Sequence, residues 1–271
     1  MSVYFQSDAV QIVCADCVTF LRDLPADAVD MTLTSPPYDH LREYEGQSEF
    51  DTMALIVELL RVTKPGGVVI WNVADATVNG DETGTSMQQA LLFKSLGFRL
   101  HDTMIYHKRN PLPASSSAKR YHQAWEYMFC FSRGDPKTFN PLMVDAKYGY
   151  LPTAASTRRS STGTREYAVV PRNKTTRVQN VFSYPIGGGI TTRDKLAFQH
   201  PALMPEALAR DQIATWTNVG DLVIDPFLGA GTTAKMSVLA GRRCIGGEIS
   251  ESYCAIATAR LRHTLGLFYG S

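Results

Sequence analysis

The feature that most constrains the fold is an alternation of short apolar runs with amphipathic segments. Strand-like runs are expected at residues 10–16, 28–35, 68–73, 221–225 and 242–250, and helical segments at residues 17–24, 50–63, 85–97, 203–217, 232–241 and from 251 onward. Two longer strand-like runs, 98–109 and 124–133, follow one another. No element is assigned to residues 1–7. Strands that alternate with helices predict an α/β fold built on a doubly wound, mostly parallel sheet.

The alternation stops between residues 134 and 195. This stretch is rich in Ser, Thr, Arg and Lys and has no sustained apolar period. It is expected to be an insertion that is partly flexible until it binds something. The chain is therefore divided into two halves of one domain, 8–133 and 196–271, separated by the insertion 134–195.

Charge is distributed unevenly along the chain. The formal net charge is only +1, but residues 107–195 hold 15 Lys and Arg against 5 Asp and Glu, and the remainder holds 12 against 21. A basic region beside an acidic remainder indicates a polyanion-binding face. Charge alone is equally compatible with a solvated basic loop.

Composition excludes several classes of protein. No apolar run approaches membrane-spanning length, and no charged-then-apolar leader is visible at the N-terminus. Five cysteines, an odd number, fit a reducing cytoplasm better than secretion. Cys14 and Cys17 form a C-x-x-C pair without a second pair or a histidine cluster, so we expect core packing and no metal site.

The stretch "LTSPPYDH" at 33–40 is unusual at the end of a core strand. Neither Pro36 nor Pro37 donates a backbone hydrogen bond, so strand pairing must end there. Ser35, a rigid Pro-Pro corner and the aromatic Tyr38 are thereby placed just beyond a buried strand.

A second landmark is "DLVIDPFLGAGTTA" at 221–234, where a strand ends at Asp225, a glycine-rich turn follows, and a helix starts at a cap formed by Thr232 and Thr233. Open parallel sheets bind ligands at such turns, where glycine lets the backbone come close to the ligand. Glu248 ends the next strand, where an acid can accept hydrogen bonds from ribose hydroxyls. Strand, turn, helix and acid together predict a nucleoside cofactor.

The two landmarks resemble those of the amino-directed DNA methyltransferases. "DPFLGAGTT" is similar to their S-adenosylmethionine (AdoMet) loop and "LTSPPY" to their catalytic loop, in the order of the circularly permuted beta group. "KPGG", "NPLP", "WEYMFCFSRG" and "FQHPALMP" match further, so that the resemblance covers about three quarters of the chain. It implies a Rossmann-like methyltransferase fold and AdoMet as cofactor.

The resemblance also implies a chemistry for the proline corner. An exocyclic amine is a poor nucleophile because its lone pair is delocalised into the base. The Ser35 hydroxyl oxygen and the Pro36 carbonyl would accept its two hydrogens, Pro37 would fix the corner, and Tyr38 would stack on the flipped base. The implied function is site-specific DNA methylation. A Ser-Pro-Pro-Tyr loop favours the cytosine amine over the adenine amine, and adenine is the alternative.

The resemblance assigns cofactor contacts one residue at a time. The residues are Asp16, His200, Pro201, Asp225, Pro226, Phe227, Gly229, Gly231, Thr232, Thr233 and Glu248. Two of them have a plainer reading, Asp16 as a surface acid and His200 as a helix cap. Trp71 and Asn72 end a central strand at the same edge of the sheet, and Trp71 is more typical of a core residue.

DNA contacts are expected from the insertion and the segment before it. The candidates are Lys108, Arg109, Lys119, Arg120, Arg158, Arg159, Arg165, Arg172, Lys174 and Arg177. Phosphate contact is their commoner role. The predicted partner is double-stranded DNA; a separate restriction endonuclease and a homodimer stay open. Two rivals also stay open, a small-molecule or protein methyltransferase and an inactive DNA-binding regulator of the same fold.

Overall fold

The computed structural model describes residues 2–37, 50–111, 113, 119–147, 153–159, 163, 165–171, 173–187 and 189–269. The chain forms two compact units. The first comprises residues 1–140 and 180–271, and the second comprises residues 141–179.

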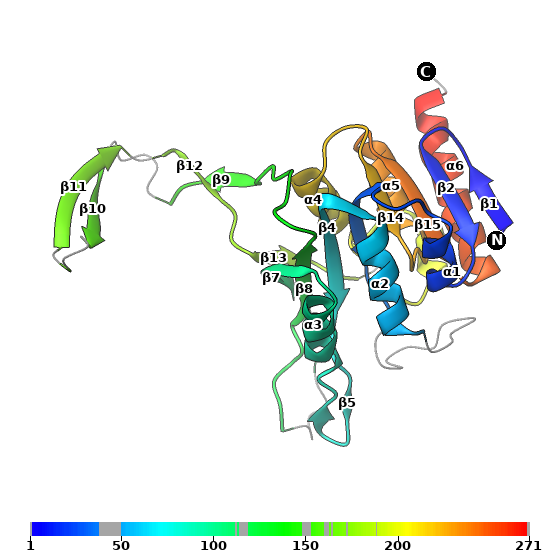
Figure 1. Ribbon diagram of the computed structural model, residues 1–271, viewed down its shortest axis with the longest axis horizontal. Helices are drawn as coiled ribbons and strands as arrows, with labels where there is room; N and C mark the ends of the chain where they lie inside the picture. The colour runs from blue at the N-terminus through cyan, green and yellow to red at the C-terminus, as the bar shows by residue number, and fades with distance from the viewer. Residues whose placement is uncertain are drawn as a thin grey trace. The chain divides into compact units, whose positions relative to one another are not determined.

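The first unit is built on a mixed sheet with the strand order β1-β2-β15-β14-β3-β4-β8-β7-β13 (Figure 1). Neighbours from β2 to β4 pair in parallel, and so do β7 and β13. Only the pairings of β1 with β2, and of β8 with β4 and β7, are antiparallel among the described strands of this sheet. The predicted mostly parallel, doubly wound sheet is therefore confirmed.

The strands of this sheet are β1 Ser2–Gln6, β2 Val10–Cys14, β3 Val29–Thr34, β4 Thr63–Val73, β7 Arg99–Lys108, β8 Trp125–Ser132, β13 Val181–Tyr184, β14 Leu222–Asp225 and β15 Arg243–Glu248. The helices are α1 Cys17–Arg22, α2 Thr52–Val62, α3 Thr85–Ser95, α4 Glu206–Trp216, α5 Thr232–Leu239 and α6 Glu251–Tyr269, with a short 3-10 helix η1 at Lys195–Gln199. A small hairpin joins β5 Thr77–Val78 to β6 Asp81–Glu82.

Helices cover both faces of the sheet, so the apolar core forms one layer on each side of it. One apolar cluster joins the sheet to α1, α2 and α3 and contains Phe20, Ile56 and Trp71. Two others join the opposite face to α4, α5 and α6. Trp71 is fully buried, with its indole N–H bonded to Gln89 Oε1 at 2.9 Å, as expected for a core residue.

This topology brings the two sequence landmarks together. Strand β3, which leads into Ser35, pairs in parallel with β14, which leads into the glycine-rich turn. Their carboxyl ends therefore share one edge of the sheet, although about 190 residues separate them in sequence. Strand β8 runs the other way, so its first residues, including Glu126, reach the same edge.

The second unit consists of two antiparallel pairs in its described residues. Strand β9 Met143–Asp145 pairs with β12 Thr175–Arg177, and β10 Thr153–Arg159 pairs with β11 Arg165–Pro171. This unit covers a shorter stretch of sequence than the predicted insertion 134–195, because Asn140 bonds to the end of α4 and β13 pairs with β7 in the main sheet. Arg158, Arg159 and Arg165 lie on the β10–β11 hairpin, and Arg172 lies outside the described residues.

Three local predictions need correction. Strand β1 occupies residues that the sequence left unassigned, and it pairs with β2 as an edge strand. Strand β4 begins at Thr63 rather than after "KPGG", because Thr63 already pairs with Val29, and an irregularity in the register takes up the Pro-Gly-Gly turn. Strand β13 was not predicted, because it lies within the polar stretch before residue 195. No helix among the described residues is long and apolar enough to cross a membrane.

Candidate active site

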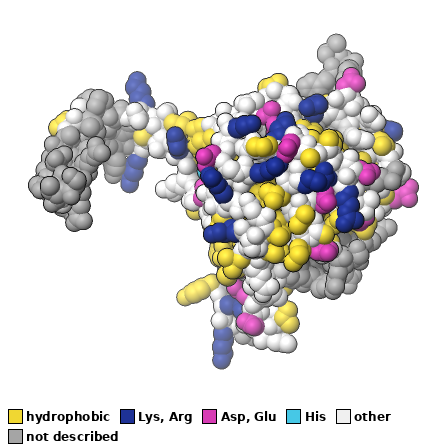
Figure 2. Space-filling view, viewed as in Figure 1, with side chains coloured by type: hydrophobic (Ala, Val, Ile, Leu, Met, Phe, Trp, Pro, Cys, Tyr) yellow, Lys and Arg dark blue, Asp and Glu magenta, His cyan; other side chains and the backbone are white. Residues whose placement is uncertain are grey.

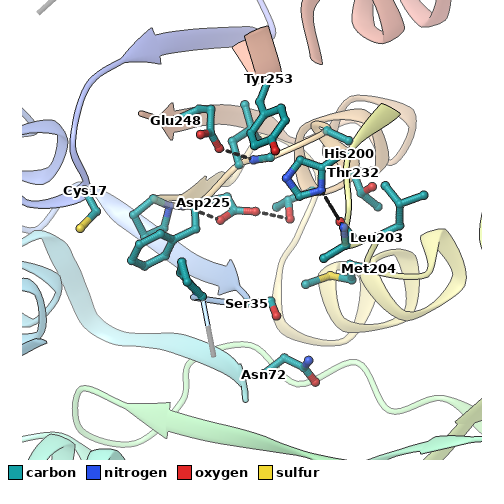
Figure 3. Close-up of a pocket in the computed structure, with 18 of the residues that line it drawn as sticks. Cys17, Ser35, Asn72, His200, Leu203, Met204, Asp225, Thr232, Glu248 and Tyr253 are labelled. Carbon is teal, nitrogen blue, oxygen red and sulfur yellow. Dashed lines mark hydrogen bonds between the residues drawn. The ribbon is translucent and has the colours of Figure 1, made fainter. Parts of the chain in front are cut away.

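A cavity of about 890 Å³ opens at the carboxyl edge of the sheet in the first unit. Its lining includes Ser35 and Pro37 from the end of β3, the glycine-rich turn after β14, Glu248 from β15, and the segment from His200 to Pro205. In Figure 3, Asp225 and Glu248 lie beside the turn, and Ser35 and Asn72 lie on the neighbouring strands. The volume is typical of a pocket that holds one small ligand.

Asp225 links the two landmark loops. Its Oδ1 accepts hydrogen bonds from Thr34 Oγ1 at 2.6 Å and from the Phe227 backbone N–H at 3.0 Å, and its Oδ2 accepts one from Thr233 Oγ1 at 2.7 Å. The carboxyl group is buried, and its contacts all belong to the fold itself. Asp225 also lines the cavity, and its contact with the cofactor stays a prediction; its carboxylate shapes the glycine-rich turn and ties it to the end of β3. Thr34, which makes that tie, was missed by the sequence analysis.

Burial sets the ionisation of both acids at this edge. Desolvation raises the pKa of Asp225 to about 6, even though hydrogen bonds from Thr34, Thr233 and Phe227 favour the charged form. Desolvation also raises the pKa of Glu248, against the hydrogen bonds that it accepts from backbone N–H groups. Both acids are thus held away from water at a place where the fold supplies donors for the carboxylate.

Glu248 holds the glycine-rich turn from its other side. Its Oε2 accepts a hydrogen bond from the Gly229 N–H at 2.7 Å, and its Oε1 accepts one from the Ser250 N–H at 2.9 Å. A carboxylate has about four acceptor sites, so acceptor capacity remains for a hydroxyl of a ligand. The predicted position of an acid at the end of β15, lining the cavity, is confirmed.

Two glycines of the turn are required by contacts within the protein. Gly229 has φ +51°, and a Cβ there would lie 2.9 Å from His200 Nε2. Gly231 has φ +79°, and its Cβ would lie 2.9 Å from the Cβ of Ala257 on α6. Gly231, rather than Thr232 or Thr233, is the N-cap of α5. The predicted threonine cap is therefore wrong, because the Thr233 hydroxyl turns back to Asp225.

His200 closes the cavity over this turn. Its ring meets the Tyr253 ring at a centroid distance of 4.4 Å in an edge-on arrangement, and its Nδ1 lies within hydrogen-bond reach of the Ala202 backbone. Helix α4 begins later, at Glu206, so His200 does not cap it; His200 is instead the C-cap residue of η1, where its backbone N–H donates to the Ala197 carbonyl. Pro201 also lines the cavity.

The outer members of the predicted cofactor set lie at the same cavity. Asp16 caps α1 through bonds from Val18 and Thr19 N–H, and although burial acts to raise its pKa, these bonds lower it. Phe227 packs on Phe50 at a ring distance of 5.0 Å. Asp16, Pro226, Phe227, Gly229, Thr232 and Thr233 all line the cavity.

A buried network of ion pairs holds the glycine-rich turn in place, and it was not predicted from the sequence. Arg260 of α6 is fully buried and donates to the Ala230 carbonyl within the turn, to Asp194 Oδ2 at 2.9 Å and to Glu206 Oε1 at 3.0 Å. Lys235 also donates to Glu206 Oε1, at 2.8 Å. The network ties the turn to the segment that carries His200.

The catalytic landmark is only partly described. Ser35 and Pro37 line the cavity, with Pro36 between them, whereas Tyr38 lies outside the described residues. Beside Ser35, strands β4, β7 and β8 each contribute one polar side chain, respectively Asn72, Lys108 and Glu126. Lys108 Nζ lies 2.6 Å from Glu126 Oε1, and Asn72 Nδ2 donates to Glu126 Oε2 at 2.6 Å.

The predicted DNA-contacting residues divide into two sets. Within the first unit, Lys108 lies in the cavity wall, Arg109 donates to the Ser183 carbonyl at 3.0 Å, and Arg120 clamps the β5–β6 hairpin through Thr77 and Gly80. Arg109, Lys119 and Arg120 are exposed, whereas Lys108 is half-buried. Lys174 and Arg177 are exposed on the second unit. On the face drawn in Figure 2, positive side chains of the first unit are interspersed with acidic ones.

Four of the five cysteines are buried. All five are free, and Cys17 is buried in the core, where desolvation and the charge of Asp16 raise its thiol pKa to about 12. Among the described residues, no group of three or more His, Cys, Asp or Glu side chains is placed to hold a metal ion.

Comparison with known proteins agrees with this geometry. A family model described as a DNA methylase, for N6 and N4 methyltransferases, matches residues 29–259. The chain is 48% identical over 244 residues to an orphan methyltransferase, M.BamHII, of Bacillus amyloliquefaciens, covering 87% of this chain and 89% of that protein. It is 26% identical over 269 residues to the DNA adenine methyltransferase YhdJ of Escherichia coli, covering 95% and 84% of the two chains.

Solved structures show the same fold. The cytosine-N4-specific PvuII DNA methyltransferase superposes with a TM-score of 0.70 at 16% identity, covering 95% of this chain and 88% of that one. The complex of M1.HpyAVI with AdoMet superposes with a TM-score of 0.60 at 21% identity, covering 93% and 99%. With the landmark loops joined at one cavity and the family model spanning most of its length, this chain belongs to the amino-directed DNA methylases, whose methyl donor is AdoMet.

Proposed function

We propose that the protein methylates the exocyclic amine of cytosine at a specific site in double-stranded DNA. The observation that carries the proposal is the hydrogen-bonded chain Thr34–Asp225–Thr233, which fixes the Ser35 corner and the glycine-rich turn to each other at one cavity. A methyl donor at the turn and a base amine at the corner would then meet within a single pocket.

The roles at the cofactor end follow from the lining. AdoMet supplies an electrophilic methyl group when bound. Glu248 has acceptor capacity left for ribose hydroxyls, and Asp16 presents a second carboxylate at the neighbouring strand end. His200 and Tyr253 cover the turn and keep water from the transfer. The remaining members of the predicted set, from Asp225 to Thr233, hold the turn in the shape that admits the donor.

At the base end, the protein must hold the two hydrogens of the amine so that the lone pair on its nitrogen is freed. The Ser35 hydroxyl oxygen and the Pro36 carbonyl each accept one N–H of the amine, which lets the nitrogen pyramidalise and frees its lone pair for attack on the methyl carbon. Transfer would form the carbon–nitrogen bond as the carbon–sulfur bond breaks, with the electron pair left on the sulfur of S-adenosylhomocysteine, and the amine would then release a proton to solvent water. Such preorganised acceptors lower a barrier because they need no reorganisation during the reaction. Tyr38 is assigned to stack on the flipped base.

Cytosine is favoured by the serine in the Ser-Pro-Pro-Tyr loop, by resemblance. The adenine amine is the second candidate, since the Escherichia coli relative is named an adenine methyltransferase and both amines present two hydrogens. We further propose that unit 141–179, with Arg158, Arg159, Arg165, Arg172, Lys174 and Arg177, recognises the target sequence. Whether an endonuclease partner or a homodimer accompanies this activity is a separate question.

The test is transfer of labelled methyl from AdoMet to DNA, with RNA and protein as parallel acceptors. Label in DNA alone, recovered as N4-methyldeoxycytidine by nucleoside mass spectrometry, is the expected result. Recovery as N6-methyldeoxyadenosine would replace the base but keep the mechanism. Label in protein or RNA alone, or in none of the three, would reject the proposal.

A further inference from the structure

The polar group on β4, β7 and β8 is built like a recognition element rather than a surface ion pair. Both oxygens of Glu126 are engaged, one by the Lys108 ammonium and the other by the Asn72 amide, each at 2.6 Å. The side chains of Lys108 and Glu126 are 21% and 12% exposed. Exposed ion pairs contribute little to stability, whereas a pair held by a third partner in a cavity wall fixes the direction of its donors.

The group faces the same space as Ser35. In strands, every second side chain shares a face of the sheet. Leu33, Ile70, Tyr106 and Met128 belong to one core cluster, and Ser35, Asn72, Lys108 and Glu126 each lie two residues from one of them, toward the carboxyl edge. The register places Thr34 beside Trp71, so Ser35 and Asn72 follow at the same level of the sheet. All four line the cavity.

Lys108 is the member with donors to spare. An ammonium group carries three N–H donors and no acceptor, and the contact of Lys108 with Glu126 engages one of them. A base held at Ser35 by its amine presents its ring edge to this wall. In cytosine that edge continues from the amine to two acceptors, N3 and O2. In adenine it continues to one acceptor, N1, and then to a carbon-bound hydrogen.

We propose that Lys108 recognises the N3–O2 edge of the flipped target base, with Glu126 as the residue that positions the ammonium and Asn72 as the residue that positions Glu126. The inference rests on the proposed function and adds a specificity determinant to it. A site built to bond a substrate group rejects an analogue that lacks it, because the buried donor is then left without its partner. The Lys108 contact therefore favours cytosine, whose edge offers two acceptors, over adenine, whose edge offers one.

The test measures the contact of Lys108 with a base that lacks the exocyclic amine. Two duplexes carry the target site, one with pyrimidin-2-one at the target position and one with an abasic residue there. Pyrimidin-2-one keeps N3 and O2 but lacks the exocyclic amine. Binding is measured by fluorescence anisotropy with saturating S-adenosylhomocysteine for the wild type, Lys108→Met and Lys64→Met. Lys64 is a matched control, because its ammonium pairs with Asp30 at 2.7 Å at the opposite end of the same sheet.

The wild type is expected to bind the pyrimidin-2-one duplex about 10- to 100-fold more tightly than the abasic duplex, as a charge-assisted hydrogen bond provides. Lys108→Met should bring the two affinities together, while AdoMet affinity, measured by calorimetry, stays within about twofold. Lys64→Met should keep the wild-type preference. If Lys108→Met fails to fold, Glu126→Gln carries the comparison, with a smaller but definite loss of preference.

Two outcomes would overturn the inference: no preference in the wild type, or equal weakening of both duplexes by Lys108→Met, which a merely structural role produces. A wild type that binds neither duplex and transfers no methyl group to DNA would instead reject the proposed function. The two failures are thus distinguishable.

Discussion

The two walls of the cavity use polar side chains differently. On the wall formed by β14 and β15, Asp225 and Glu248 are bonded to hydroxyls and N–H groups of the fold, and Arg260 holds the turn from behind. On the wall formed by β4, β7 and β8, polar side chains bond to one another and Lys108 retains donors. The first wall is a scaffold whose disturbance should affect stability and cofactor binding. The second should affect the base.

The largest effect is expected at Arg260. Arg260→Met removes the buried cation that Asp194 and Glu206 share, leaving Lys235 as their remaining cation among the described residues. Breaking a buried pair by removing one partner costs about 3–5 kcal/mol, because the other charge stays buried. Chemical denaturation should show this loss. Arg262→Met, an exposed position on the same helix, should change stability by about 1 kcal/mol or less. Equal effects at the two positions would contradict the scaffold description.

At Asp225, the scaffold role of the β14–β15 wall can be tested through the pH dependence of stability. Its pKa is about 6 when folded and 3.8 ordinarily, so between these values the folded state binds more protons than the unfolded state. The contribution of this group to stability is full below about pH 4 and is lost as the pH rises through 6, by about 3 kcal/mol in all. The free energy of unfolding of the wild type relative to Asp225→Asn should therefore rise as the pH falls from 7 to 5. Asp23→Asn, at an exposed acid outside the cavity, is the control substitution.

A smaller effect is expected for the cofactor at Glu248. Glu248→Gln replaces one acceptor oxygen by a donor that faces a backbone N–H and removes the negative charge. AdoMet affinity measured by calorimetry should fall about tenfold, which corresponds to one hydrogen bond to a charged group. Glu251→Gln, at an exposed acid on the first turn of α6, is the control. Unchanged affinity in Glu248→Gln would remove Glu248 from the cofactor site.

The smallest effect is expected outside the cavity, on the second unit. Reversing the charge of Lys174 and Arg177 should weaken DNA binding several-fold near 0.15 M salt and make it less dependent on salt, by a slope of about 0.9 for each lost phosphate contact. Anisotropy titrations across a salt series measure both quantities, with Lys94→Glu on α3 as the control. A salt slope that stays at its wild-type value would place the phosphate contacts elsewhere.

The predictable parts of this molecule are those governed by local pattern. The alternation of strands and helices, the turn after Asp225 and the corner after Thr34 all depend on residues close together in sequence. The scaffold of the site does not. Arg260 meets Ala230, and Thr34 meets Asp225, only because the sheet order joins distant segments. Glu126 reaches the edge because β8 is antiparallel, which no local pattern indicates. The candidates of the insertion were chosen by charge, whereas Lys108 was chosen because it flanks a segment that resembles a loop bordering the target base pocket. Neither signal indicates the contact of Lys108 with Glu126.

The most direct test of the account is a single-turnover reaction at saturating AdoMet, with the product base identified by nucleoside mass spectrometry, for the wild type and Ser35→Ala. The wild type should form N4-methyldeoxycytidine in DNA. Ser35→Ala should form the same product about 10- to 100-fold more slowly, because one preorganised acceptor of the amine is lost, with AdoMet affinity unchanged within about twofold. Loss of AdoMet binding in step with the rate, or a wild-type rate in Ser35→Ala, would contradict the assignment of this corner to the base.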